Sequence, residues 1–367
     1  MSDNCCGEEK SSCCSSDDCC TEEVITQFDK SDKWIVGKIE TSKGAVPTIS
    51  TSLSFKDILG ACKVRFGIGR MNYKINPGLY AIGNPNKQSP VFVSANYKLT
   101  FDTLRKNLSD IECWILILDT NGVNVWCAAG KGTFGTDELV NRIEETGLSE
   151  IVAHRRLILP QLGASGVNSN EVVQQSGFFL VFGTVRASDI KQFIADDFKA
   201  TQEMRTVKFT LWDRIVLMPV ELVAAIKISL LILGVLFIIN LFAARQFDVY
   251  DFTAYAGAVL VGTVVTPTLL PIIPGKAFSW KGWLLGLCWT VFALWIFGWF
   301  SPGFWLLSVG YLLLLPSVSA YLAMNFTGSS TYTSPSGVLK EMKIALPLII
   351  GSSAVGAVLV LIKNLFI

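Results

Sequence analysis

One cysteine of this chain has neighbours that suit metal chemistry. The stretch NVWCAAGKGTF, residues 124–134, follows an apolar run and places Cys127 between a tryptophan and two alanines. The alanines favour a short helix, bounded by Gly122 and Gly130, that would hold the sulfur on one face. Lys131 nearby favours the thiolate, which is the form of cysteine that binds metal. The segment therefore predicts a candidate metal ligand on a short helix.

The surroundings of Cys127 limit the kind of metal site. One thiolate with no second ligand close by in the sequence does not make a zinc or an iron–sulfur site. It suits a metal that a macrocycle already holds and that needs only an axial ligand, as in a haem or a corrinoid. The residues alone leave open whether Cys127 is such a ligand or an uninvolved thiol. Cys113 and Cys288 lie in apolar runs and are expected to be small buried hydrophobes.

Other catalytic signals are weak. The one histidine, His154, stands beside two arginines and is expected to cap or pack rather than catalyse. No phosphate-binding loop and no complete G-x-G-x-x-G pattern occurs, and the fragment Gly67-Ile-Gly69 is interpreted as a turn. The formal net charge of +1 offers no field for nucleic acid, which is not expected as a partner.

Residues 1–23 form a polar tail that is expected to be disordered. It holds three adjacent cysteine pairs, and adjacent cysteines form a disulfide with each other only under strain. Vicinal thiolates suit soft cations, so the tail either captures a thiophilic metal or is a low-complexity segment without that role. The six cysteines are Cys5, Cys6, Cys13, Cys14, Cys19 and Cys20.

Residues 24–205 alternate short apolar runs with helix-like segments, and this pattern favours an α/β, Rossmann-like, doubly wound domain. Continuous apolar strands are typical of a parallel sheet that is covered on both faces. The predicted strands are Leu79–Gly83, Val91–Ser94, Trp114–Asp119, Leu157–Gln161 and Phe178–Phe182. The predicted helices are 100–109, 136–146, 168–176 and 188–198, with Thr136 and Ser188 as caps.

Gly, Ser, Thr and Asn gather where the predicted strands end. In such folds ligands bind at the carboxyl ends of the strands, so these loops favour a shared pocket, although each loop alone is equally well explained as a turn. The candidate pocket residues are Ser94, Asn96, Gly163 and Gly166. The strand-end loops are Gly83–Pro85, Ser94–Asn96, Asp119–Gly122, Gln161–Gly166 and Gly183–Thr184.

The rest of the chain predicts a membrane domain. After a juxtamembrane linker at 206–221, residues 222–367 contain five apolar stretches of about 20 residues, enough for each to cross a hydrocarbon core as a helix. Lys and Arg near their ends favour a cytoplasmic α/β domain on an inner, cytoplasmic membrane crossed several times. No span carries the paired carboxylates or buried arginines of a pump, which favours anchoring over transport. The predicted spans are 222–244, 253–273, 282–301, 304–323 and 344–364.

NVWCAAGK resembles the cap-helix signature of the HgcA family of mercury-methylating corrinoid proteins, which is related to the large subunit of the corrinoid iron–sulfur protein. The flanking text RFGIGRMNYKINPGLYAIGNP, SPVFVSANYK and LILDTNGVNVWCAAGKGTFGT extends the resemblance over most of residues 60–220. The later MNFTGSSTYTSPSGVLKEM and the apolar spans after the first domain are similar too. The triple Cys-Cys tail looks like an addition to the family pattern.

The resemblance implies a cobalamin or other corrinoid cofactor with Cys127 as the lower axial ligand to cobalt and as the catalytic residue. The cap helix that presents Cys127 would consist of Asn124, Val125, Trp126, Ala128, Ala129, Gly130 and Lys131. Its small residues would let the helix lie close to the corrin face. The implied reaction passes a methyl group from the Cys-ligated methylcorrinoid to Hg(II) and forms methylmercury.

The resemblance also implies partners. These are a ferredoxin with two [4Fe–4S] clusters as electron donor, a methyl donor such as a methyltetrahydrofolate-linked methyltransferase, Hg(II) as substrate, and membrane lipid. Two other functions stay open. One is a corrinoid methyl carrier for another acceptor, such as an acetyl-CoA-forming partner, and the other is a corrinoid- or metal-binding protein at the membrane.

Overall fold

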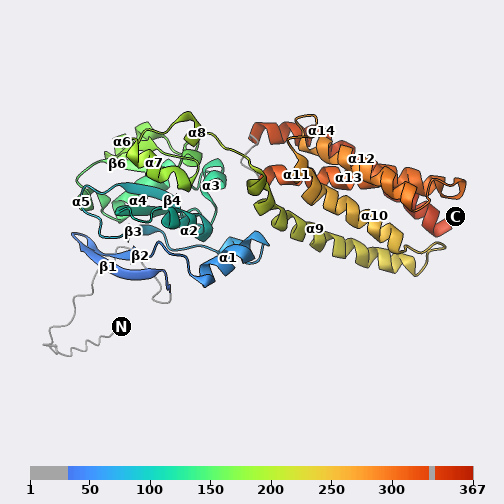
Figure 1. Ribbon diagram of the computed structural model, residues 1–367, viewed down its shortest axis with the longest axis horizontal. Helices are drawn as coiled ribbons and strands as arrows, with labels where there is room; N and C mark the ends of the chain where they lie inside the picture. Colours follow the sequence, from blue (N-terminus) through green and yellow to red (C-terminus); the bar gives the residue numbers. More distant parts are fainter. Residues whose placement is uncertain (1–31, 330–334, 367) are drawn as a thin grey trace, which may run out of the picture.

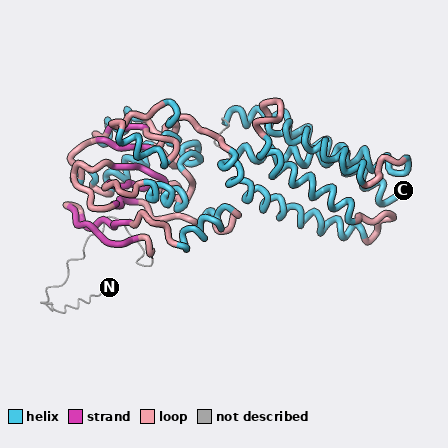
Figure 2. The backbone as a smooth tube through the Cα atoms, viewed as in Figure 1, coloured by secondary structure: helices cyan, strands magenta, loops and turns pink. Residues whose placement is uncertain are grey.

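The protein has two parts that lie end to end (Figure 1). The computed structural model describes residues 32–329 and 335–366. All of its strands lie in the first part, and the second part is helical (Figure 2). The predicted tail with its six cysteines lies outside the described residues.

A seven-stranded sheet forms the centre of the first part, in the order β1-β2-β3-β5-β4-β6-β7. Strands β4, β5, β6 and β7 run parallel to one another, whereas β3 is antiparallel to its neighbour β5. The strands are β1 (Ile35–Thr41), β2 (Gly44–Ile49), β3 (Gly78–Ile82), β4 (Val91–Ala95), β5 (Cys113–Leu118), β6 (Arg156–Leu159) and β7 (Phe179–Phe182).

Five of these strands, β3 to β7, confirm the predicted ones within two residues at each end. Their continuous apolar sequence is explained by burial on both faces: every residue of β3, β4 and β5 is buried. The hairpin of β1 and β2 was not predicted. β1 is an edge strand with Gly37, Lys38 and Glu40 in it, so it lacks the apolar run by which the others were recognised.

Helices cover both faces of the sheet, as the doubly wound prediction requires. One core cluster packs the sheet against α3, α4, α5 and α6, and the other packs it against α2 and α7. The helices are α1 (Phe55–Arg65), α2 (Lys98–Asn107), α3 (Val125–Lys131), α4 (Thr136–Glu145), α5 (Leu148–Ile151), α6 (Ser169–Ser176), α7 (Ile190–Ala195) and α8 (Gln202–Arg205). Three short 3₁₀ turns join them: η1 (Arg70–Asn72), η2 (Gln161–Gly163) and η3 (Ala187–Asp189).

The predicted helix caps were wrong. Gly135, not Thr136, is the N-cap of α4, and Ser188 lies inside η3, before the α-helical residues of the predicted 188–198 segment. In both cases the N-cap residue is the one next to the hydroxyl residue, Gly135 for α4 and Asp189 for α7. Neither hydroxyl therefore accepts a hydrogen bond from the first turn of its helix.

The direction of β3 corrects the prediction that all strand-end loops share one edge. Because β3 is antiparallel to β5, Ile82 pairs with Cys113, the first residue of β5. The loop Gly83–Pro85 therefore lies at the opposite edge of the sheet from the other four. The physical reason is the connection 83–90, which is too short to cross back over the sheet, since a parallel connection takes a dozen or more residues.

The second part contains five long helical segments. They are α9 (Leu211–Asn240), α10 (Val249–Leu260) continued by the π-helical turn η4 (Val261–Val265) and α11 (Thr266–Leu269), α12 (Phe278–Ile296), α13 (Trp305–Ser329) after the 3₁₀ turn η5 (Pro302–Phe304), and α14 (Pro335–Phe366). Most of the predicted linker at 206–221 is therefore the start of α9, because Thr210 and Asp213 form a capping box that begins the helix early.

Among the described residues, four helices are long and apolar enough to cross a membrane: α9, α10 with α11, α13 and α14. Helix α12 falls outside this group because Lys281 and four tryptophans lower its mean hydropathy. It nevertheless packs closely on α13. A Cβ on Gly282 would lie 2.5 Å from the Cβ of Ala323, and one on Gly286 would lie 2.7 Å from that of Ser319. Such contacts between small residues are typical of membrane helix packing.

One expectation about side chains in the helical part was wrong: Cys288 is exposed, because it lies on the outer side of α12. Arg214 and Asp251 are buried charged residues of this part, and each lies before a predicted span, 222–244 and 253–273 respectively. Arg214 donates hydrogen bonds to the carbonyls of Pro267 and Thr268, at 2.9 and 2.6 Å. Pro271 cannot donate an N–H to the first of these carbonyls, so the arginine takes that place.

Candidate functional site

The edge of the sheet where β4, β5, β6 and β7 end brings the remaining four strand-end loops together. Asn96, directly after β4, organises two of them. Its side-chain oxygen accepts hydrogen bonds from the backbone N–H of Thr120 at 3.1 Å and of Gly122 at 3.0 Å. Its amide donates to Asp119 at 2.9 Å. Asn96 is buried, and these hydrogen bonds fix the loop that leads into α3.

Helix α3 carries the predicted signature. Asn124 is its N-cap, and the Asn124 side chain accepts a hydrogen bond from the N–H of Cys127 at 2.9 Å. The helix runs through Gly130 and ends at Gly132, whose φ of 81° closes it in the left-handed conformation. The prediction that Gly130 would end the helix was therefore wrong by two residues.

The two faces of α3 differ sharply. Val125, Ala128 and Ala129 are buried against the sheet, where they belong to the core. Trp126 and Cys127 are half-buried, and Gly130 and Lys131 are exposed. A Cβ built on Gly130 would meet nothing within 4 Å, so the space beside Cys127 on this outer face is open. The helix thus holds its thiol on the side that faces away from the domain core, one turn from a residue without a side chain.

Gly163 and Gly166 lie close to α3, and their role is packing. A Cβ on Gly163 would lie 2.6 Å from the ring of Phe134, and one on Gly166 would clash with the Phe134 carbonyl and lie 2.9 Å from Cα of Ala129. The loop after β6 therefore supports the buried side of α3. Gly163 leaves room for the ring of Phe134, and Gly166 leaves room for the backbone of Phe134 and Ala129, whereas their predicted contact with a ligand stays a prediction.

The two cysteines of this domain that the sequence singled out differ in their surroundings. Cys113 is completely buried in β5, and burial raises the pKa of its thiol, which stays protonated. Cys127 is half-buried on the outer face of α3. Among the described residues, no group of three or more His, Cys, Asp or Glu side chains could hold a metal ion. His154 packs at the opposite edge of the sheet, as expected. Its ring Nε2 lies 2.9 Å from the carbonyl oxygen of Ser89.

A cavity of about 340 Å³ opens at this same edge, beside the start of α3. The ends of β4, β6 and β7, helix α2 and Asn124 with Val125 line it, and Ser94 is the one candidate pocket residue from β4 in its wall. Arg65, at the end of α1, also lines it. The sequence gave no signal for Arg65, because α1 itself was not predicted.

Unpaired polar atoms mark this region. Arg65 Nε, Thr133 Oγ1 and Gln161 Oε1 are buried without a hydrogen-bond partner. Thr133 follows α3, and Gln161 begins η2, which packs on α3. Three other side chains of the described residues, Trp34, Asp102 and Asn364, also carry such atoms. Buried polar groups are nearly always paired with protein or ordered water, so each of these atoms is available to a water molecule or to a polar ligand.

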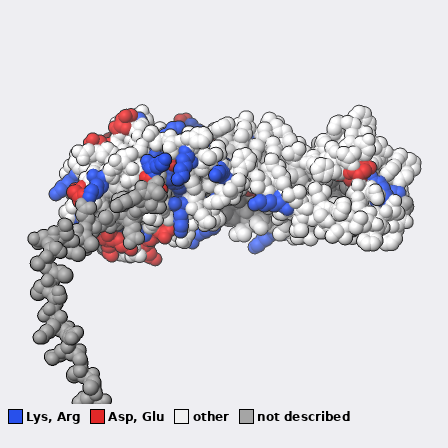
Figure 3. Space-filling view, turned by 90° about the horizontal axis from the view of Figure 1, so that it is seen from below, with Lys and Arg blue, Asp and Glu red and all other residues white. Residues whose placement is uncertain are grey.

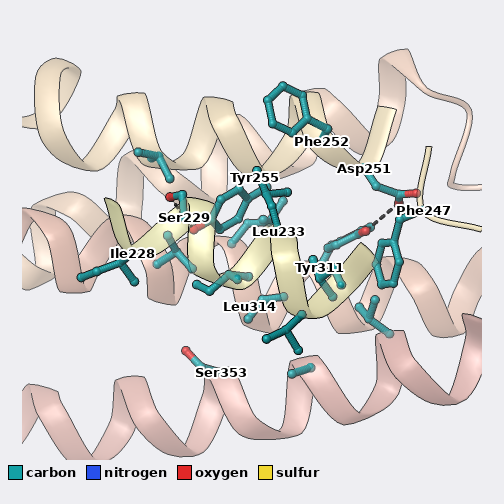
Figure 4. A pocket seen from close by; sticks show the side chains of 18 of the residues that line it. Ile228, Ser229, Leu233, Phe247, Asp251, Phe252, Tyr255, Tyr311, Leu314 and Ser353 are labelled. Atoms are coloured by element: carbon teal, nitrogen blue, oxygen red, sulfur yellow. Dashed lines mark hydrogen bonds between the residues drawn. The ribbon is translucent and has the colours of Figure 1, made fainter. Parts of the chain in front are cut away.

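A larger cavity, of about 810 Å³, lies among α9, α10, α13 and α14 in the helical part (Figure 4). Its walls are almost entirely apolar, with Ile228, Leu233, Phe252 and Leu314 among them. Its polar end is closed by the hydrogen bond from Tyr311 to Asp251 at 2.6 Å. Asp251 is further paired with Arg245 at 3.0 Å. No thiol lines this cavity, so it is not the candidate site for the chemistry predicted from Cys127.

Comparison with known proteins places the site in a matched region. Residues 48–194 match the family model described as CO dehydrogenase/acetyl-CoA synthase delta subunit. The acetyl-CoA decarbonylase/synthase complex subunit gamma of Methanocaldococcus jannaschii is 35% identical over 125 residues, which are 34% of this chain and 25% of that protein. The subunits of the same name from Methanopyrus kandleri and Archaeoglobus fulgidus are 34% and 31% identical, over 33% and 37% of this chain and 26% and 30% of their own lengths.

The chain thus spans about a quarter to a third of the length of these relatives. The match begins in β2 and ends in α7, and it includes every candidate site residue from Ser94 to Gly166. The helical part from Leu211 on lies outside it. The α/β part of this chain is therefore similar in sequence to the acetyl-CoA decarbonylase/synthase subunits, and the similarity does not extend to the helical part.

Proposed function

We propose that this protein is a membrane-anchored corrinoid methyltransferase, in which Cys127 is the lower axial ligand to cobalt and Hg(II) is the methyl acceptor. The observation that carries the proposal is the half-buried thiol of Cys127 on the outer face of α3, next to the open space at Gly130. The similarity of residues 48–194 to subunits of acetyl-CoA decarbonylase/synthase complexes supports methyl-group chemistry at this site.

The residues present fit a corrinoid. A flat macrocycle needs an uncrowded surface, which Gly130 leaves beside the thiol, and a rigid support, which Ala128, Ala129, Gly163 and Gly166 give from beneath the helix. A corrin ring carries amide side chains, and the unpaired polar atoms of Arg65, Thr133 and Gln161 would find hydrogen-bond partners there. When bound, the corrinoid supplies a cobalt that accepts and releases a methyl group.

Residues around Cys127 fix the position and direction of its side chain. The cap by Asn124 fixes the first turn of α3 and so fixes the direction of the Cys127 side chain. Asn96 fixes the loop before the helix. Lys131, one turn beyond Cys127, places an exposed cation at the end of α3. Together these residues would hold the Cys127 sulfur toward a bound corrinoid, whose cobalt it would contact.

The remaining partners are part of the same proposal. A two-cluster [4Fe–4S] ferredoxin would keep the cobalt reduced, and a methyltetrahydrofolate-linked methyltransferase would supply the methyl group. The helical part would anchor the protein in an inner membrane with the α/β part in the cytoplasm. The four apolar helices support the anchor.

A second acceptor is favoured by the comparisons. Because the matched relatives are named as subunits of an acetyl-CoA decarbonylase/synthase complex, the same site could pass its methyl group to an acetyl-CoA-forming partner. The two functions share the corrinoid and Cys127, and they differ only in the acceptor.

Reconstitution of the full chain with cobalamin tests the site. The wild-type protein and the control Cys62→Ala, which removes a different, exposed thiol, are expected to show a cobalt–thiolate absorption spectrum that Cys127→Ala lacks. Methylmercury formed from Hg(II) and a methyl donor would then support the mercury acceptor. A corrinoid spectrum without methylmercury would favour the second acceptor, and a normal cobalt–thiolate spectrum in Cys127→Ala would remove the basis of both.

A further inference from the structure

The end of helix α1 exposes apolar side chains. Helix α1 buries Asp57 and Val64 and turns Phe55, Ile58 and Leu59 outward. The exposed series continues into the segment Phe66–Met71, called here the α1 tip. In the α1 tip, Phe66 is 49% exposed, Ile68 62% and Met71 66%. Three large apolar side chains in a row of six residues need a partner surface if water is to be excluded from them.

The α1 tip has a defined conformation. Gly67 and Gly69 have φ values of 75° and 65°, which are accessible to glycine without strain. The N–H of Ile68 donates to the carbonyl of Lys63 at 2.9 Å, and that of Gly67 donates to Val64 at 3.1 Å. These bonds close the C-terminus of α1, so Ile68 projects from a hydrogen-bonded turn. The motif that the sequence interpreted as a turn is thus a turn that displays an apolar side chain.

The α1 tip lies beside α9, the first apolar helix, at the level of Val220 along the helix axis. A Cβ on Gly67 would lie 3.7 Å from Cγ2 of Val220 in α9. From Val220 to Asn240, where α9 ends, a helix rises about 30 Å, which is the thickness of a hydrocarbon core. If α9 crosses a membrane, the α1 tip therefore lies level with the boundary between hydrocarbon and headgroups on the side of the α/β part.

The charges around the α1 tip suit a lipid surface. Lys63 is exposed in the last turn of α1, and Arg70 follows Gly69. The helix ends on the same side carry Lys276, Lys340 and Lys343, all exposed. Lys and Arg gather on this face where the α/β part adjoins the helices, while the sides of the helices are nearly free of charge (Figure 3). An apolar turn flanked by cations is typical of segments that lie in the interface of an anionic membrane.

We propose that the α1 tip is a second, shallow membrane contact, in which Phe66, Ile68 and Met71 enter the interface and Lys63 and Arg70 pair with anionic lipid headgroups. The contact would hold the α/β part against the bilayer, in addition to the contacts that α1 and Arg186 make with α9. It does not depend on the proposed corrinoid or mercury chemistry, only on the membrane location of the helical part.

This contact would also set the position of the candidate site. The carbonyl oxygen of Met71 would lie 3.2 Å from a Cβ on Gly122, in the loop that leads into α3. The N–H of Ile75 donates to the carbonyl of Asn96 at 2.9 Å. The α1 tip is therefore joined directly to the loops that carry Cys127, and lipid contact at the tip would hold this edge of the sheet close to the membrane surface.

Photocrosslinking of the full chain in lipid nanodiscs tests the contact. Benzoylphenylalanine is placed at position 68 or, as a control, at position 36, because Val36 is exposed to a similar extent, 64%, on the edge strand β1 far from the helices. Irradiation followed by mass spectrometry is expected to give phospholipid adducts at position 68 and none at position 36. Equal lipid adducts at both positions, no lipid adduct at 68, or crosslinks from 68 only to another protein chain would overturn the proposal.

Lipid composition provides the second measurement. The adduct yield at position 68 is expected to rise when phosphatidylglycerol replaces part of the phosphatidylcholine, and the paired change Lys63→Gln with Arg70→Gln is expected to remove that rise while the protein stays folded by circular dichroism. A yield that ignores both the anionic lipid and the two substitutions would refute the pairing with headgroups.

Discussion

The side-chain oxygen of Asn124 accepts a hydrogen bond from the backbone N–H of Cys127 at 2.9 Å. This contact joins the residue that begins helix α3 to the residue that carries the thiol. An N-cap satisfies one of the N–H groups that the first turn of a helix leaves without an intrahelical partner. In a helix of seven residues, one such bond is a large share of what keeps the first turn closed.

Asn124→Ala is expected to loosen α3 locally. Loss of an N-cap costs about 1 kcal/mol, which corresponds to roughly a fivefold increase in the opening of the helix. Hydrogen exchange of the α3 amides measures it directly. Asn124→Asp keeps an acceptor oxygen and should exchange like the wild type, and unchanged exchange in Asn124→Ala would show that packing of Ala128 and Ala129 alone holds the helix.

Gly130→Ala and Gly166→Ala should have opposite effects on stability. At Gly130 a methyl group meets open space, and alanine is favoured over glycine in a helix by about 0.5–1 kcal/mol, so the variant should be at least as stable as the wild type. At Gly166 a methyl group clashes with Phe134 and Ala129, and such overpacking costs about 1–3 kcal/mol. Thermal unfolding compares the two variants.

Cobalamin binding is a second test of the Gly130→Ala variant. If a corrinoid lies on the outer face of α3, the stable Gly130→Ala variant should bind cobalamin more weakly than the wild type, because its methyl group stands one turn from Cys127. Titration with cobalamin, followed by absorbance, is the measurement. Unweakened binding by Gly130→Ala would place the cofactor elsewhere.

The α/β part should lose stability in acid through Asp57. Burial by itself would raise the pKa of this carboxyl, but hydrogen bonds from Lys98 and Ser54 outweigh it and hold the pKa below the ordinary value of 3.8. A lowered folded-state pKa gives stability that is present above about pH 4 and is lost as the pH falls further, by at most about 1.4 kcal/mol per pH unit for one proton. Denaturant unfolding between pH 5 and pH 3 should show this slope, and Asp57→Asn should reduce it.

Asp57→Asn is also expected to destabilise at neutral pH. Asp57 pairs with Lys98 and Arg105 at 2.9 Å, and Arg105 is completely buried. Removing one partner of a buried ion pair costs about 3–5 kcal/mol. Glu150→Gln serves as a control, because its pair with Lys43 is exposed and such a pair is worth about 0–1 kcal/mol. Equal effects of the two changes on the free energy of unfolding would contradict this account.

Arg214→Leu should weaken the helical part. Arg214 bonds to the carbonyls of Pro267 and Thr268, and a buried polar group left without a partner costs about 1–3 kcal/mol. Loss of helical circular dichroism on heating in detergent measures the effect. Arg214→Lys keeps a donor and should recover part of the loss. If the lysine and leucine variants melt together, the hydrogen bonds are not the cause.

The sequence predictions succeeded for elements whose residues show a local apolar pattern, and they failed for elements without one. Strands β3 to β7 were predicted within two residues because each is a short, continuous apolar run, which burial on both faces explains for β3, β4 and β5. The edge strand β1 and the outward-facing α1 were missed, because neither shows the pattern of an element that buries its apolar residues. Gly163 and Gly166 were recognised as sites of close approach, and in the structure Phe134 approaches both while Ala129 of α3 approaches Gly166.

The sequence by itself determined the local features: an Asn-capped helix with one thiol on its outer face, buried strands, and apolar helices long enough for a bilayer. Neighbours along the chain decide these features, so they can be found in a single segment. Only the tertiary structure decided that β3 runs against β5, that Asn96 and Gly122 meet, and that Arg214 closes a helix more than fifty residues away. Such contacts depend on the direction and packing of segments that are distant in sequence, and no local pattern records them.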